Sequence, residues 1–148
     1  RFYCRKLKKG SIKLPKENIL KMMKGFVDRV KKNKIVTLDF IKKQIKKNKK
    51  IFLYGASTKG NTVLQYYGLK KRIIPYAAER SPFKWGKYTI GTGIKIISEN
   101  EAKKLKPDFF FVTPWGFIKE FIKREKNWLN NGGKFILPFP KMKIIGKK

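Results

Sequence analysis

The chain has 148 residues, with 39 Lys and Arg against 9 Asp and Glu, and its formal net charge is +30. This length is typical of one domain. The 41% hydrophobic residues exclude a disordered chain, which would have a low hydrophobic content. The absence of His and the single Cys exclude a Ser-His-Asp triad, a Cys-His pair, a zinc cluster and an internal disulfide.

The first residues, Arg1 to Cys4, are predicted to form a short strand, and a basic connector follows from Arg5 to Leu14. Because the chain begins at Arg1 without an initiator Met, we expect it to be a piece of a longer polypeptide. No stretch approaches the roughly 18 uncharged apolar residues of a membrane span, and no secretory signal pattern is present. A cytoplasmic location is therefore expected, in agreement with the cysteine usage.

A long amphipathic helix is predicted after the connector, over residues 15–50. Pro15 suits the first turn of a helix, and apolar residues recur mostly three or four positions apart. They are Ile19, Leu20, Met23, Phe26, Val27, Val30, Leu38, Ile41 and Ile45. The pattern fits one helix or two in line with a break near Asn33, and the basic stretch from Lys46 to Lys50 suits the negative end of the helix dipole.

From Ile51 onward, short apolar runs alternate with amphipathic stretches. The predicted strands are Ile51–Tyr54, Ile73–Ala77, Ile94–Ile97, Phe109–Val112 and Phe135–Leu137. The predicted helices are Asn61–Tyr67, a segment to Leu105 opened by the Ser98 and Glu101 capping box, and Phe117–Leu129. This alternation predicts an α/β, Rossmann-like fold, with a mostly parallel sheet flanked by helices and preceded by the long helix.

Ligands of such sheets bind beyond the carboxyl ends of the strands, which here lead into three loops. The first reads Tyr54-Gly55-Ala56-Ser57-Thr58-Lys59-Gly60-Asn61-Thr62. Its glycines, the helix N-terminus and Lys59 suit a phosphate. However, Ser57 replaces the middle glycine of the dinucleotide fingerprint, and Asn61 stands where a Walker loop has Lys. A purely structural tight turn is the alternative interpretation.

The other two loops contribute an acid and several aromatic residues. Glu79 ends the second predicted strand, where an acid commonly meets ribose hydroxyls, although pairing with a lysine is an equal alternative. Tyr88 and Trp85 could form a pocket wall. Trp115 lies in the Thr113-Pro114-Trp115-Gly116-Phe117 loop, where it is either a stacking platform or a packed cap over the sheet.

The lysine excess has two interpretations. Together with abundant Ile and Asn, it is the profile of a strongly AT-rich coding sequence. Alternatively, it attracts a phosphate-rich partner, either a nucleotide or a nucleic acid. Nucleic-acid binding is the weaker hypothesis, because the basic stretch from Lys16 to Lys50 contains only Phe26 and Phe40 as aromatic residues.

The ordered motifs together resemble the C-terminal domain of S-adenosylmethionine-dependent sugar C-methyltransferases. Besides the first loop, the resemblance rests on Glu79-Arg80-Ser81-Pro82, Gly91-Thr92-Gly93-Ile94, Ile97-Ser98-Glu99, Pro114-Trp115-Gly116-Phe117, Arg124-Glu125 and Gly132-Gly133-Lys134-Phe135-Ile136. Arg1-Phe2-Tyr3 also looks like the last strand of the methyltransferase domain of this family. Many relatives carry His or Asn where this chain has Gly116, which has no side chain to make the corresponding contact.

The resemblance implies a division of labour. Residues 1–14 would end an upstream methyltransferase domain that binds S-adenosylmethionine and carries the catalytic base, residues 15–50 would link the domains, and residues 51–148 would help to enclose a nucleotide-diphosphate sugar. Zinc would bind an N-terminal segment of the complete enzyme. No cofactor, metal or catalytic residue is expected within this chain, which alone would be inactive.

The residues expected on the substrate side are Gly55, Lys59, Gly60, Asn61, Glu79, Tyr88 and Trp115. Two other functions stay open. One is a free-standing Rossmann-like module that binds a nucleotide or coenzyme without methylation. The other is a basic nucleic-acid-binding protein.

Overall fold

The computed structural model describes residues 16–147 and divides the chain into two units, residues 1–32 and 33–148. The predicted strand at Arg1–Cys4 and the connector lie outside the described residues. Helix α1 (Lys16–Lys46) crosses the boundary as one continuous helix, without the break considered near Asn33. No helix of the described residues is long and apolar enough to cross a membrane.

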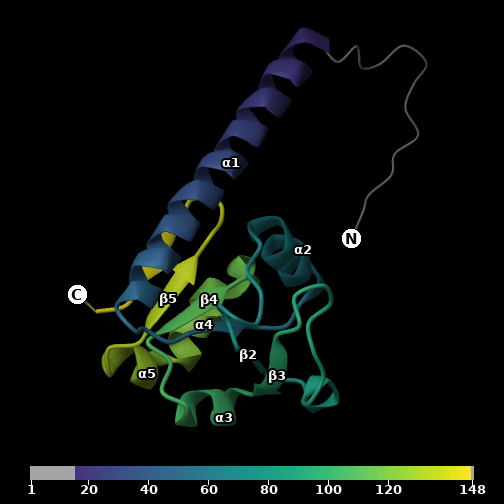
Figure 1. Ribbon diagram of the computed structural model, residues 1–148. Helices are drawn as coiled ribbons and strands as arrows, with labels where there is room; N and C mark the ends of the chain where they lie inside the picture. Colours follow the sequence, from purple (N-terminus) through teal and green to yellow (C-terminus); the bar gives the residue numbers. More distant parts are fainter. Residues whose placement is uncertain (1–15, 148) are drawn as a thin grey trace, which may run out of the picture. The chain divides into compact units, whose positions relative to one another are not determined.

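The second unit contains a six-stranded sheet in the order β3-β2-β1-β4-β5-β6 (Figure 1). Its strands are β1 (Ile51–Tyr54), β2 (Tyr76–Glu79), β3 (Lys95–Ser98), β4 (Phe109–Val112), β5 (Lys134–Leu137) and β6 (Lys143–Ile145). The first five are parallel, and β6 pairs antiparallel with β5. The predicted α/β class and mostly parallel sheet are therefore confirmed.

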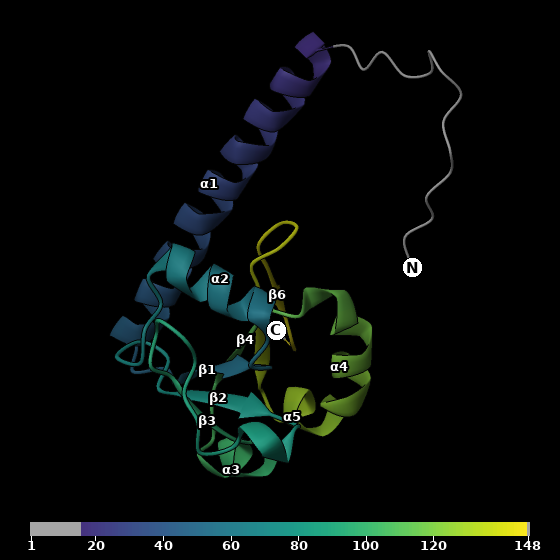
Figure 2. The same ribbon diagram turned by 90° about the vertical axis from the view of Figure 1, so that its right-hand side faces the viewer.

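Helices cover both faces of this sheet (Figure 2). They are α2 (Thr58–Tyr67), α3 (Glu99–Lys104), α4 (Ile118–Arg124) and α5 (Lys126–Asn130), with short 3-10 turns η1 (Pro82–Lys84) and η2 (Trp115–Phe117). Helix α2 and the second half of α1 pack on one face, whereas α3, α4 and α5 pack on the other.

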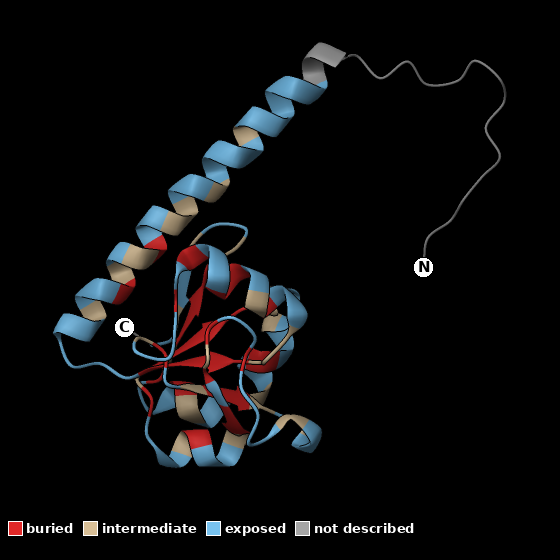
Figure 3. Ribbon diagram, turned by 45° about the vertical axis from the view of Figure 1, so that its right-hand side comes forward, coloured by how far each residue is buried: buried red, intermediate tan, exposed pale blue. Residues whose placement is uncertain are grey.

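The central strands β1 and β4 are buried on both faces because they lie between these two layers (Figure 3). Along β4, Phe109 and Phe111 face the layer of α2, while Phe110 and Val112 face the layer of α4 and α5. Burial of each large apolar side chain contributes about 1.5–3 kcal/mol. Continuous apolar strands thus specify a central sheet with two covered faces.

Two strands of the sheet were not predicted correctly. The second strand is Tyr76–Glu79 rather than Ile73–Ala77, because the amides of Ile73 and Ile74 both bond to the carbonyl of Lys70 in a turn. Ile74 is buried as a turn residue instead. The strand β6, at the edge of the sheet, was missed altogether.

The helix predicted over Phe117–Leu129 is divided into η2, α4 and α5. Its interruption coincides with Glu125, whose side chain is buried and contacts the Tyr54 hydroxyl and the Lys103 ammonium. The backbone of Glu125 leaves the helical region, with φ −99° and ψ 21°. A tertiary contact that local periodicity does not encode accompanies the break.

Two buried hydroxyls of the described residues, those of Thr37 and Tyr67, lack a hydrogen-bond partner. Tyr67 is 3% exposed, its ring packs against Phe111 and Phe139, and its hydroxyl has no hydrogen-bond partner among the described residues. Burial raises the pKa of Tyr67 to about 12, whereas an unfolded tyrosine titrates near about 10.

We predict that Tyr67→Phe is as stable as the parent protein, or more stable by up to about 1 kcal/mol, near neutral pH, because no hydrogen bond is lost. A raised folded pKa gives stability that is present below about pH 10 and is lost between about pH 10 and 12. At about pH 11 the parent should therefore lose about 1 kcal/mol relative to the variant. Urea unfolding at about pH 8 and pH 11 measures this, with Tyr66→Phe at an exposed position as control. A parent-to-variant difference that does not change with pH would contradict the prediction.

Candidate functional site

The chain order of the strands reverses between β1 and β4, which are neighbours in the sheet. Each is followed by a loop into a helix on a different face of the sheet, α2 after β1 and α4 after β4. Such a topological switch point leaves a crevice at the carboxyl ends of the strands, where ligands of α/β sheets bind. The first and third predicted loops meet at this point.

The loop after β1 forms a capped helix N-terminus. The Ser57 side chain accepts a hydrogen bond from the amide of Gly60 (3.1 Å), and α2 begins at Thr58. Sequence periodicity placed the start at Asn61, three residues too late, because the loop's polar residues lack an apolar pattern. The amide of Asn61 already bonds to the carbonyl of Ser57 (3.0 Å), so Asn61 sits within the helix ladder.

Glycine is required in this loop because the loop after β4 approaches closely. A Cβ atom at Gly60 would lie 2.6 Å from the Thr113 Oγ1 atom, and a Cβ at Gly55 would lie 2.9 Å from Pro114. Gly55 also has a positive φ of 83°, which glycine adopts without strain. Thr113 is fully buried and donates to the carbonyl of Gly55 (3.4 Å). Both glycines therefore bring the two loops into contact.

A cavity of about 340 Å³ lies between these loops. Its lining comes from the first turn of α2 and the start of η2 and consists of Ser57, Thr58, Lys59, Thr113, Pro114, Trp115, Gly116 and Phe117. Lys59 is exposed and is the only charged lining residue among residues 16–147. Trp115 is half-buried and packs against Phe139, with ring centroids 5.1 Å apart, so it is both a packed cap and a wall of the cavity.

Glu79 ends β2 at the same edge of the sheet but is already engaged. Its carboxylate accepts hydrogen bonds from the amides of Ala56 (2.9 Å) and Ser81 (3.0 Å) and contacts the Lys84 ammonium at 3.3 Å. Lys84 also donates to the carbonyl of Ala56 (3.0 Å). The acid predicted for ribose hydroxyls therefore ties the loop after β1 to the loop after β2.

Tyr88 lies away from the other predicted residues. It pairs with Lys95, the first residue of β3, and so lies toward the amino end of that strand. Tyr88 is 62% exposed and does not line the cavity between the loops after β1 and β4. The structure thus brings together Gly55, Lys59, Gly60 and Trp115 with Glu79 beside them, and it leaves Tyr88 apart.

A hydrogen-bond network around Tyr54 and Arg124, which the sequence did not predict, lies on the other side of the loop after β1. The Tyr54 hydroxyl donates to Glu125 (2.8 Å) and accepts from Arg124 Nη2 (2.7 Å). Arg124 also contacts Glu99 at 2.8 Å, and Lys103 contacts Glu125 at 2.8 Å. Burial, together with Glu125, raises the pKa of Tyr54 far above its usual value, although the Arg124 hydrogen bond opposes the shift.

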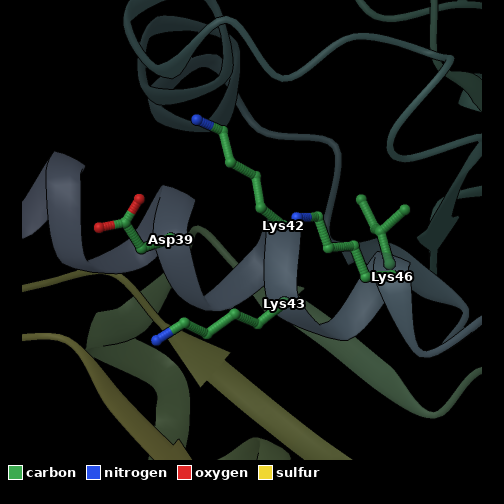
Figure 4. Close-up of a pocket in the computed structure, with 5 residues that line it drawn as sticks. Asp39, Lys42, Lys43 and Lys46 are labelled. Carbon is green, nitrogen blue, oxygen red and sulfur yellow. The ribbon is translucent and has the colours of Figure 1, made fainter.

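The basic helix does not form a comparable site. Figure 4 shows a depression on α1 lined by Asp39, Lys42, Lys43 and Lys46. The lysine side chains leave the helix in different directions, so their ammonium groups do not converge on one point. Within residues 16–147, no group of three or more His, Cys, Asp and Glu side chains could hold a metal ion.

Residues 15–140 match the family described as the C-methyltransferase C-terminal domain. The chain is also 36% identical over 97 residues to the C-methyltransferase NovU of Streptomyces niveus. The aligned segment covers 66% of this chain and 23% of that relative, so the chain spans less than a quarter of the curated protein that it matches.

We predict that Gly60→Ala destabilises the protein by about 1–2 kcal/mol, because the new methyl group meets the buried Thr113 hydroxyl. Overpacking of this kind costs about 1–3 kcal/mol, and the better helix propensity of Ala returns part of it. Urea denaturation measures the change. Gly116→Ala is the matched control, since nothing lies within 4 Å of its new Cβ. Equal stability of the two variants would disprove the tight contact.

Proposed function

Since this chain belongs to the C-methyltransferase C-terminal domain family, we propose that it binds the nucleotide-linked sugar that such an enzyme methylates. A separate domain of the same polypeptide would bind S-adenosylmethionine, carry the catalytic base and transfer the methyl group. The methyltransferase class rests on the family match and on the 36% identity to NovU. The substrate side is our inference from the site.

The observation that carries this proposal is the helix N-terminus at the switch point. Ser57 satisfies the amide of Gly60, and the amide of Asn61 bonds to the Ser57 carbonyl, which leaves the amides of Thr58 and Lys59 for an anion. Unpaired amides and the helix dipole favour a phosphate. The Lys59 ammonium adds a positive charge in the same cavity, so we assign the diphosphate to this cavity.

The role of such a domain is positional. A diphosphate held at Lys59 would fix the attached sugar carbon relative to the methyl donor of the other domain. The two reacting groups would then not need to meet by diffusion, because the protein holds them in a reactive orientation. Gly55 and Gly60 serve this role indirectly, because they hold the α2 N-terminus against the loop after β4. Trp115 closes one side of the same cavity.

In the described residues, the carboxyl edge of this sheet lacks the free acid that usually binds the ribose of a nucleotide cofactor such as S-adenosylmethionine. In nucleotide-binding sheets, the acid at the end of the second strand accepts the ribose hydroxyls, whereas Glu79 is occupied by two backbone amides and Lys84. We therefore propose that S-adenosylmethionine binds the separate methyltransferase domain. Zinc is likewise proposed for a segment outside this chain.

Lys59→Ala in the natural gene product should weaken the binding of nucleotide sugars about 5- to 10-fold, because a charge-assisted contact to phosphate is lost. Isothermal titration with the glucose esters of ADP, GDP, CDP, UDP and dTDP identifies the ligand and measures its affinity. Lys104→Ala, which removes an equal charge from an exposed position on α3, should leave the affinity unchanged.

Two results would count against this proposal. An unchanged affinity in Lys59→Ala would remove the role of the α2 N-terminus. An equal loss in both lysine variants would indicate that the ligand responds only to the overall positive field of the protein, without a phosphate site at Lys59.

A further inference from the structure

A second cavity, of about 290 Å³, adjoins the first at the carboxyl edge of the sheet. The two cavities share Ser57, Pro114 and Phe117 in their linings, so they lie on either side of the β1 and β4 loops. The second cavity extends over the end of β2, the start of α3 and one face of α4. A ligand whose diphosphate lies over α2 can therefore reach into it.

The two cavities differ sharply in charge. Lys59 is the only charged residue of the first, whereas the second is lined by Glu79, Glu99 and Glu120 and by Arg80, Lys84 and Arg124. The chain contains only 9 Asp and Glu residues among 148, so three of its few acids line one cavity. Three negative and three positive groups balance formally, and the carboxylates disfavour a phosphate in this position. The second cavity is thus suited to an uncharged polar group.

Two of these acids keep a free acceptor. Glu99 contacts Arg124 through Oε1 at 2.8 Å, and Glu120 contacts the same guanidinium through Oε1 at 3.3 Å. Within the described residues, neither Oε2 atom has a hydrogen-bond partner. Glu79 differs, because its two oxygens receive the amides of Ser81 and Ala56.

Arg124 holds these acceptors in place from below. Its guanidinium donates to the Tyr54 hydroxyl through Nη2 (2.7 Å) and Nε (3.2 Å) and lies over the Phe121 ring at 5.1 Å. Tyr54 is 1% exposed and is fixed in turn by Glu125. A planar guanidinium with several directed contacts has little conformational freedom. Its ion pairs therefore hold the Glu99 carboxylate in place and restrict the motion of the more exposed Glu120 carboxylate.

We propose that this second cavity binds a hydroxyl-bearing ring of the nucleotide sugar and that Glu99 and Glu120, rather than Glu79, accept hydrogen bonds from its hydroxyl groups. This inference rests on the proposed function, because the diphosphate at Lys59 places the neighbouring ring. Phe117, which is 61% exposed, lines the same cavity and offers an apolar face to the C–H groups of a ring. The ring is either the sugar that accepts the methyl group or the ribose of the nucleotide, because both carry ring hydroxyl groups.

The test compares Glu120→Ala and Glu99→Gln with the parent in the natural gene product. The probes are inorganic pyrophosphate, the nucleoside diphosphates ADP, GDP, CDP, UDP and dTDP, and their glucose esters, each titrated calorimetrically. We expect each variant to weaken the binding of a ring-bearing ligand about 5- to 10-fold, as for loss of a partly exposed charge-assisted hydrogen bond. Pyrophosphate affinity should not fall. Asp39→Ala removes the same charge from an exposed position on α1 and should change nothing.

The source of the ring decides which ligands respond. A loss for glucose esters but not for nucleoside diphosphates places the sugar in the second cavity, and an equal loss for both places the ribose there. Either result supports the proposal. Circular dichroism and urea unfolding of both variants test whether a loss of affinity comes from unfolding. Glu120→Ala should remain folded, because Glu120 is exposed and its ion pair with Arg124 contributes little to stability.

The failures of the two proposals are distinguishable. Unchanged affinity for all ring-bearing probes in both folded variants, with a loss in Lys59→Ala, would overturn the hydroxyl-binding cavity and leave the phosphate site standing. A parent protein that binds none of the probes would overturn both. A loss of pyrophosphate affinity as large as the loss of nucleotide-sugar affinity would also overturn the inference, because the effect would then act on the phosphate.

Discussion

The close contact between the loops after β1 and β4 is the constraint on which the candidate site depends. The absence of side chains at Gly55 and Gly60 lets Pro114 and Thr113 approach to distances that a Cβ atom would not permit. This contact aligns the N-terminus of α2 with the start of η2. Both cavities of the carboxyl edge share residues of these loops, so a shift of either loop would change both. A side chain at either glycine would therefore displace the loops at the carboxyl edge of the sheet.

The scarce acids of this lysine-rich chain act as structural ties. Glu79 joins two loops, Glu125 joins β1 to α3 through Tyr54 and Lys103, and Asp108 accepts from the Lys50 amide (2.9 Å). Burial alone would raise the pKa of Asp108, but the hydrogen bonds from Lys49 and the Lys50 amide hold it below its usual range. These three acids are thus bound where chain segments meet.

Much of the fold could be predicted because burial on both faces leaves a strong local signal. Phe109–Val112 was predicted with its observed bounds, and the Ser98–Glu101 capping box is present with both of its reciprocal hydrogen bonds. The errors arose where the role of a residue depends on contacts with residues far away in the sequence. Ile74 is apolar because a turn is buried, and the helix interruption at Glu125 coincides with a contact to Tyr54, 71 positions away. Periodicity carries no information on such partners.

The sequence by itself determined the alternation of strands and helices, the position of the glycine-containing loop after the first strand and the family resemblance, because apolar periodicity, glycines and short motifs are local properties. Only the tertiary structure decided which loop residues meet. It showed that Glu79 is occupied by backbone amides, that Tyr88 lies toward the amino end of β3, and that Arg124 joins Tyr54 to Glu99. These relations depend on the order and register of parallel strands, which bring distant segments to one edge of the sheet and which no single segment encodes.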